Sequence, residues 1–158
     1  MEDIIVGWMT WCDIVPYKEQ LIDMERELIV KYHYPDWDIS RQYPEASVDR
    51  LEEHLANVNT YFWGIRTKSK LLGYYWGYAC DFIDTKRWNL RSLMLLPEIN
   101  GKGYAKQAIS AAHQKALELG CTEAATDYAP FNRAMAGLIK SCGYEIKRIE
   151  VVKKLISK

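Results

Sequence analysis

The most constraining feature of the chain is an apolar strand that runs through a two-glycine turn directly into a helix, LMLLPEINGKGYAKQAISAA, from Leu93 to Ala112. Backbone N–H groups at a helix start have no partner within the helix, and the helix dipole places partial positive charge there. Gly101 and Gly103 let the backbone approach a ligand, because neither carries a Cβ atom. The segment therefore predicts a binding site for a phosphate or pyrophosphate group. The plain alternative is a loop followed by a helix cap, because glycine is common in turns.

The size and composition of the chain are those of one globular domain. Of its 158 residues, 49% are apolar and 27% are charged, so it can bury a substantial core. The 21 basic residues balance the 21 acidic residues, which argues against the long-range attraction that nucleic-acid binders use. We therefore expect a single domain over residues 1–158 and no nucleic-acid partner.

The cysteines and the N-terminus indicate which cellular setting the chain suits. The four cysteines lie far apart, with no C-x-x-C pair and no histidine at zinc spacing, so we expect free thiols and no metal. The N-terminus starts with acidic residues and lacks a long apolar run, which is typical of neither a signal peptide nor a membrane span. These observations predict no membrane association and a reducing, cytoplasmic location.

The first half of the chain predicts one strand followed by two helices. The strand extends from Ile4 to Trp11, and Asp13 is expected to cap a helix with Pro16 in its first turn. The apolar stripe of this helix consists of Tyr17, Leu21, Met24 and Leu28. An aromatic-rich loop from His33 to Glu45 follows, and Ser47 is expected to cap the second helix. The stripe of the second helix consists of Val48, Leu51, Leu55 and Val58.

The second half predicts three antiparallel strands and then a β-α-β unit. The strands are the runs TYFWGIRT, LLGYYWGYACDFI and WNLRSLMLL, whose connections are too short for a parallel crossover. A helix from Gly103 to Leu119 leads to a strand at EAATDYA, which should lie parallel to the strand at Leu93. Asn132 is expected to cap a short helix ending at Gly143, and YEIKRIEVVKKLI predicts one or two terminal strands. The fold class is therefore α+β, with a mixed sheet and about four helices.

One motif of this chain resembles the acyl-CoA pyrophosphate motif of the GNAT superfamily of N-acetyltransferases, Q/R-x-x-G-x-G/A. Gly103 and Ala105 occupy its last two defined positions, and Asn100 stands where the family prefers Gln or Arg. The resemblance covers essentially the whole chain. It implies a GNAT-like fold, with a mostly antiparallel mixed sheet in which two parallel strands splay apart.

A second motif, NRAMAGLIKSCGY, is similar to the family pattern N-x-x-A-x-x-L-Y-x-x-x-G-F. Asn132, Leu138 and Gly143 match, and Tyr144 replaces the closing phenylalanine. The two positions that do not match are Met135 and Ile139.

The resemblance implies that the chain binds acetyl-CoA as its co-substrate. Asn100 opens the motif, and the pyrophosphate would lie on the backbone N–H groups of Gly101, Lys102, Gly103, Tyr104 and Ala105. The side chains of Lys102 and Lys106 would add charge at the rim or remain solvated. The pantetheine arm would pair with the backbone of Met94, Leu95 and Leu96, and the Asn132 side chain would reach the arm as well as cap its helix.

The implied reaction is attack by a neutral amine on the thioester, with coenzyme A thiolate leaving. A primary ammonium ion has a pKa near ~10, so a base must remove its proton. Residues 88–91, where many relatives place that base, offer no carboxylate, and Asp81 and Asp84 are the nearest acids upstream; Asp84 is retained as a candidate. Ile139 stands where relatives carry a proton-donating tyrosine, so Tyr128 is a candidate substitute donor. Both candidates also fit structural roles, in a solvated turn and in the core.

The resemblance places the acceptor over the first helices and their connecting loop. Its surroundings would include the aromatic residues Trp37, Tyr43, Tyr75, Trp76 and Tyr78, although most aromatics are expected in the core. The expected acceptor is a primary amine of a small molecule or a protein, and family members are often dimers.

Two other functions stay open. One is an acetyl-CoA-binding regulatory module with weakened catalysis, which Asn100 and Ile139 favour. The other is acetylation of aminoacyl-tRNA, against which the balanced charge argues.

Overall fold

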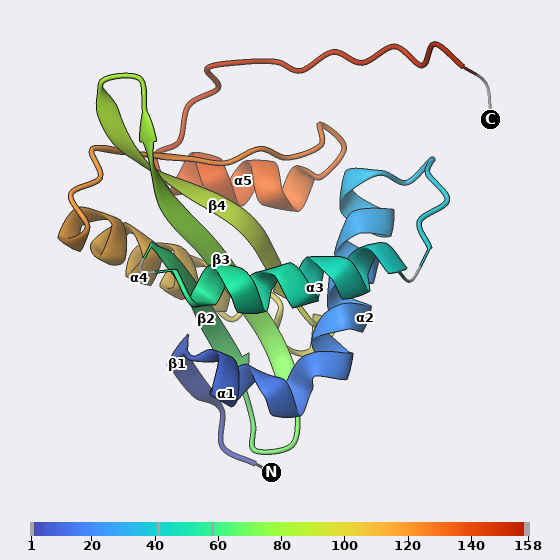
Figure 1. Ribbon diagram of the computed structural model, residues 1–158, viewed down its shortest axis with the longest axis vertical. Helices are drawn as coiled ribbons and strands as arrows, with labels where there is room; N and C mark the ends of the chain where they lie inside the picture. Colours follow the sequence, from blue (N-terminus) through green and yellow to red (C-terminus); the bar gives the residue numbers. More distant parts are fainter. Residues whose placement is uncertain (1, 41, 58, 157–158) are drawn as a thin grey trace.

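A five-stranded mixed sheet forms the centre of the molecule (Figure 1). The computed structural model describes residues 2–40, 42–57 and 59–156. The strands follow the chain order β1 (Ile5–Met9), β2 (Thr60–Arg66), β3 (Leu71–Phe82), β4 (Thr85–Leu95) and β5 (Glu123–Ala125). Neighbouring strands are antiparallel up to β4, and β4 and β5 are parallel. The helices are α1 (Trp11–Ile14), α2 (Lys18–Leu28), α3 (Gln42–Leu55), α4 (Tyr104–Glu118) and α5 (Arg133–Ser141). Three short helical turns are η1 (Val15–Tyr17), η2 (Ile29–His33) and η3 (Pro97–Ile99).

Helices cover both faces of the sheet. Successive side chains of a strand point to opposite faces, so one strand contributes side chains to the core on each side. Tyr74 and Trp76 of β3 belong to one core with α2 and α3, whereas Tyr75 belongs to a second core with α4 and α5. In Figure 1, α3 crosses in front of the sheet. The buried stripes are Tyr17, Leu21, Met24 and Leu28 before and along α2, and Ile109, Ala112 and Ala116 along α4. The predicted amphipathic helices and the parallel β-α-β unit are therefore confirmed.

Two helix starts differ from the sequence prediction. Thr10, not Asp13, caps α1: Asp13 N–H donates to Thr10 Oγ1 at 3.4 Å, and the Asp13 carboxylate accepts from Thr10 N–H at 2.8 Å. α3 begins at Gln42 rather than after Ser47, with Pro44 in its first turn, where a missing N–H is tolerated. The loop predicted from His33 to Glu45 is correspondingly shorter, and Val58 lies outside the described residues.

The prediction of one or two C-terminal strands is wrong for the described residues. Residues 145–156 form no strand, and Figure 1 shows them extended away from the sheet. Alternating composition supplies β propensity, but a strand also needs neighbouring backbone with which to pair. The exposed apolar side chains of this segment are Ile146, Ile149, Val151, Val152, Leu155 and Ile156.

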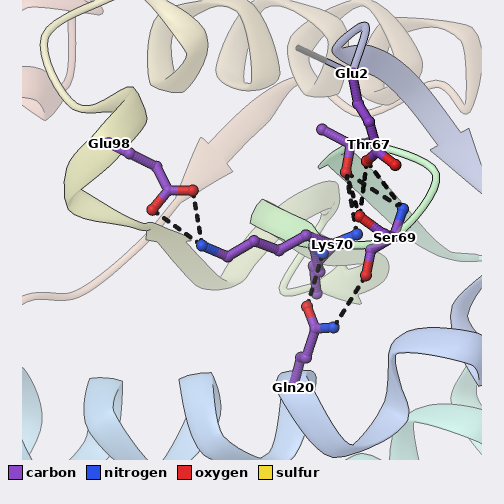
Figure 2. A network of polar contacts seen from close by, with 7 residues as sticks. Glu2, Gln20, Thr67, Ser69, Lys70 and Glu98 are labelled. Carbon is purple, nitrogen blue, oxygen red and sulfur yellow. Dashed lines mark hydrogen bonds and ion pairs between the residues drawn. The ribbon is translucent and has the colours of Figure 1, made fainter.

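Polar contacts join the β2–β3 turn to η3 and α2 (Figure 2). Lys70 Nζ lies 2.8 Å from Glu98 Oε1 on η3, and Leu71 N–H donates to Gln20 Oε1 at 2.8 Å. Ser69 Oγ–H donates to Glu2 Oε2 at 2.7 Å. Of these contacts, the Lys70–Glu98 ion pair is the one that reaches η3, and an exposed ion pair contributes about 0–1 kcal/mol. Since η3 directly precedes the glycine turn, this pair helps to position the start of α4.

Candidate active site

β4 continues past its last pair with β5. The parallel pairs are Arg87↔Glu123, Trp88↔Ala124 and Asn89↔Ala125, whereas β4 extends to Leu95. From Leu90 onward, the β4 backbone has no β5 residue opposite it, so its polar groups on that side are open to another partner. The predicted splay between the two parallel strands is therefore present. Of the predicted arm-binding residues, Met94 and Leu95 end β4 beside this gap, and Leu96 follows directly after the strand, with its N–H donated to Leu72 O at 2.8 Å.

A β-bulge lies where the splay begins. Trp76 of β3 pairs with Ser92, and the next residue, Gly77, pairs with Leu90. Arg91 therefore has no partner on β3, and its side chain is exposed while that of Ser92 is buried. A bulge changes the direction of the side chains around it and is often found beside active sites. The sequence alone gave no signal of this bulge.

The glycine turn has the geometry that an anion site requires. Gly101 and Gly103 have φ values of +74° and +85°, which L side chains rarely adopt, and a Cβ atom at either position would meet nothing within 4 Å. Gly103 precedes the first residue of α4, and no side chain caps this helix. Within the described part of the chain, the N–H groups of Tyr104, Ala105 and Lys106 have no acceptor. The space before them is open, as a bound pyrophosphate would need; Asn100, Lys102 and Lys106 are exposed at its edge.

Asn132 caps α5 as the sequence predicted. Its Oδ1 accepts a hydrogen bond from Met135 N–H at 3.1 Å. The Asn132 side chain also borders the gap between β4 and the chain after β5. The cap and a contact with a bound arm are therefore compatible.

Two pockets adjoin at the bulge. The first, the β4–β5 pocket, is lined by Leu28, His33, Leu90, Arg91, Ser92, Leu93, Asp127, Tyr128, Asn132 and Met135. The second, the α2–α3 pocket, is lined by Glu25, Leu28, Ile29, His33, Tyr34, Tyr43, Ser47, Arg91 and Ser92. Both pockets share Leu28, His33, Arg91 and Ser92. The two small cavities, of about 30 and 60 Å³, therefore lie next to each other along this common wall.

His33 is the titratable group of the common wall that can accept a proton. It ends η2, and burial lowers its pKa below the usual histidine value. The carboxylate of Asp127 opposes this shift, and the guanidinium of Arg91 reinforces it. Its imidazole is therefore largely neutral at neutral pH and can act as a base. The sequence did not predict His33, because nothing local distinguishes it within an aromatic-rich segment.

Glu25 supplies a buried carboxylate to the α2–α3 pocket. It is 5% exposed, and its Oε1 accepts a hydrogen bond from Tyr74 Oη at 2.7 Å. Burial raises the pKa of Glu25, while hydrogen bonds from Tyr74 and Ser92 oppose the shift. Sequence analysis missed this residue too. Its signal was available, since Glu25 lies next to Met24 and three positions before Leu28 on the buried stripe.

The other predicted residues are divided between the site and the scaffold. Tyr128 lines the β4–β5 pocket and Tyr43 lines the α2–α3 pocket. Asp84 lies exposed in the β3–β4 turn, and Asp81 is exposed near the end of β3; neither lines either pocket. Ile139 is buried in the core that contains α4. Of the remaining aromatic candidates, Tyr75 and Trp76 are buried, Tyr78 is half-buried, and Trp37 is exposed.

Comparisons with known proteins agree with this geometry. The model of the acetyltransferase (GNAT) family matches residues 23–144. The aminoglycoside N-acetyltransferase AAC(6')-Iy in complex with CoA has a similar fold, with a TM-score of 0.70 and 16% identity over 99% of this chain and 97% of that chain. Glucosamine-6-phosphate N-acetyltransferase from Arabidopsis thaliana gives a TM-score of 0.68 and 13% identity, covering 98% of this chain and 100% of that chain.

A third similar structure is an aminoglycoside acetyltransferase from an uncultured soil metagenomic sample in complex with sisomicin. Its TM-score is 0.69 and its identity 16%, over 98% of this chain and 97% of that chain. A comparison with curated protein sequences finds no match.

The fold, the splayed strands and the family match together define an acyltransferase. The chain belongs to the acetyltransferase (GNAT) family. In the described residues, no group of three His, Cys, Asp or Glu side chains could hold a metal ion, and no helix has the length and apolar character needed to cross a membrane.

Proposed function

We propose that this chain transfers an acetyl group from acetyl-CoA to a primary amine of a small molecule or a protein. The observation that carries the proposal is the common wall, which joins the β4–β5 pocket to a second pocket under α2 and α3. A transferase needs two such sites in contact, so that the acyl group and the acceptor meet. The similar structures in complex with CoA and with sisomicin support a carrier on one side and an amine on the other.

This chain's own groups suit an acetyl-CoA molecule. The open N–H groups at the start of α4, beside Gly101 and Gly103, would hold its pyrophosphate. The side of β4 that faces away from β3, along Met94 and Leu95 with Leu96 directly after the strand, would hold its arm, and Asn132 would border it. When bound, acetyl-CoA supplies an acetyl group that is activated as a thioester.

We assign proton removal from the amine to His33. An ammonium ion with a pKa near ~10 must lose a proton before it can attack, and a neutral imidazole at the common wall can take it. Asp127 lies close enough to stabilise the imidazolium that results. Asp84, the acid suggested by the sequence, lies outside both pockets, so we prefer His33. Tyr128 stays the candidate proton donor to the thiolate, because Ile139 has no proton to donate.

The proposal is tested by two measurements on the same sample. Acetyl-CoA should raise the melting temperature in a saturable manner, and a panel of primary amines should release free thiol from it. If acetyl-CoA neither protects the protein nor yields thiol, the proposed function is wrong. Saturable protection without thiol release for any amine would instead support the regulatory module, which the buried Ile139 favours.

The four free cysteines suit a reducing cytoplasm, and we treat the chain as one acetyltransferase domain without a nucleic-acid partner. A homodimer stays a prediction, which sedimentation of the purified protein would test.

A further inference from the structure

The charges that line the α2–α3 pocket differ in sign and in depth. Glu25 is buried at 5% exposure, whereas Arg91 is exposed at the bulge. With His33 neutral, these are the remaining groups among the described lining residues that can carry charge. The pocket therefore has an acidic interior and a basic edge. A ligand of complementary charge would place its nitrogen near Glu25 in the interior and a negative group near Arg91 at the edge.

The protein orients the Glu25 carboxylate through hydrogen bonds from Tyr74 and Ser92 and through the nearby charge of Arg91. Oε1 accepts a hydrogen bond from Tyr74 Oη at 2.7 Å, which orients the carboxylate. In its ionised form a carboxylate has about four acceptor sites, so it can still accept hydrogen bonds from an amine. Leu28 and Ile29 form the apolar part of the lining beside it, which strengthens such a contact by excluding water.

Arg91 is free to bind an anion. Its exposed guanidinium takes part in none of the hydrogen bonds or ion pairs found among the residues that the structure describes, and its charge acts on the nearby Glu25 carboxylate and His33 imidazole. The bulge separates it from the β3 pairing, so the side chain is directed by the irregular backbone rather than by a cross-strand neighbour. A guanidinium offers a planar fork of N–H donors that matches a carboxylate or a phosphate. Ser47 and Tyr43 add hydroxyl groups to the same pocket.

We propose that the acceptor is a small amine that also carries an anionic group, with its nitrogen against Glu25 and its carboxylate or phosphate against Arg91. This inference rests on the proposed function and deepens it by naming the acceptor class. A simple hydrophobic amine would bring no negative group to the exposed Arg91 guanidinium. A diamine would place a second cation beside it, which like charges disfavour.

Two matched pairs of amines test the proposal by thiol release from acetyl-CoA. One pair is 4-aminobutanoate and 1-aminobutane, and the other is O-phosphoethanolamine and ethanolamine, so the arms separate a carboxylate from a phosphate. We expect kcat/KM to be about tenfold or more higher for the anionic member of at least one pair, as for a hydrogen bond to a charged group. Putrescine, the matched dication, should be the poorest of the four-carbon amines.

Two variants test the two ends of the α2–α3 pocket separately. In Arg91→Gln, the ratio of kcat/KM within the preferred pair should fall toward one, mainly through KM of the anionic member. Arg50→Gln is the matched control, because Arg50 is exposed on α3 and lines neither pocket. Glu25→Gln should lower kcat/KM for both members of the pair and leave their ratio in place. Gln can keep the hydrogen bond from Tyr74, so this variant should still fold.

The outcomes distinguish this inference from the proposed function. Equal kcat/KM within both pairs, a preference for putrescine, or an unchanged ratio in Arg91→Gln would overturn the acceptor class. So would absence of thiol release with every anionic amine. If acetyl-CoA still protects the protein in these cases and other amines release thiol, the acetyltransferase proposal is kept and only the acceptor class is rejected. If acetyl-CoA gives no protection at all, the proposed function itself fails.

Discussion

Tyr74 on β3 donates a hydrogen bond of 2.7 Å to Glu25 on α2, and both side chains are buried between the sheet and its helical cover. The pairing keeps a carboxylate inside the protein at the wall of the α2–α3 pocket. Burial raises the pKa of Glu25 and also raises that of Tyr74. An unaided carboxylate at this depth would be costly, so the contact points to a function for the charge rather than to stability.

Replacement of Glu25 by Gln should stabilise the protein at neutral pH. The folded-state pKa is raised, so the folded chain retains its proton more readily, and stability falls as pH rises from about 4.5 through the raised pKa. The neutral amide avoids that loss. Denaturant unfolding at pH 7 should show a gain on the order of 1 kcal/mol for the variant.

Below the ordinary glutamate range, wild type and Glu25→Gln should have nearly the same free energy of unfolding, because the carboxyl is then protonated in both folded and unfolded wild-type chains. A constant difference from pH 4 to pH 8 would contradict the assignment of this pH dependence to Glu25.

Replacement of His33 by Gln should slow thiol release by about 10²-fold or more, the usual contribution of a positioned base. Protection by acetyl-CoA should persist, because the imidazole is assigned to proton transfer and not to the carrier. The fraction of free amine, whose ammonium pKa is ~10, falls with pH for both proteins; protonation of His33, whose pKa burial lowers, should add a further decline in the wild type that is absent from the variant.

The matched control for His33 is His54→Gln. His54 lies on α3, stacks near Trp76 at 6.3 Å between ring centroids, and lines neither pocket. Equal rate losses in the two variants would indicate general damage and would remove His33 from the mechanism.

Replacement of Gly103 by Ala should weaken acetyl-CoA binding and destabilise the fold by about 1–2 kcal/mol, because its φ of +85° is unfavourable for an L side chain. Gly137→Ala in α5 is the control, since a Cβ there meets nothing within 4 Å and the helical backbone accepts it. The control should gain about 0.5–1 kcal/mol. Calorimetric titration with acetyl-CoA would check both, and equal affinities would contradict the pyrophosphate site.

Asn132 has two assigned roles that substitution can separate. Asn132→Asp should keep the cap on α5, because Asp is as good a capping residue, but it lacks the amide donor for a bound arm. Asn132→Ala should lose the cap as well, at a cost of about 1 kcal/mol. If acetyl-CoA affinity in Asn132→Asp equals that of wild type, the residue is only a helix cap.

Much of the fold was predictable because its signals are local. The stripes of α2 and α4, the start of α4 at the glycine turn and the Asn132 cap depend on residues a few positions apart. The mistaken cap at Asp13 and the start predicted too late for α3 arise because several residues nearby can serve as a first turn. The prediction of C-terminal strands failed for another reason: no local pattern indicates whether a sheet edge is available for pairing.

The sequence by itself determined the family-specific turn and the helices around it, because glycine conformation and helix periodicity are properties of a few adjacent residues. Only the tertiary structure decided which groups meet in the two pockets. Glu25 and His33 lie more than fifty positions before Arg91, and they converge through the packing of α2 on the sheet and a bulge in the β3–β4 register. Long-range register sets such contacts, and no short segment of the chain encodes it.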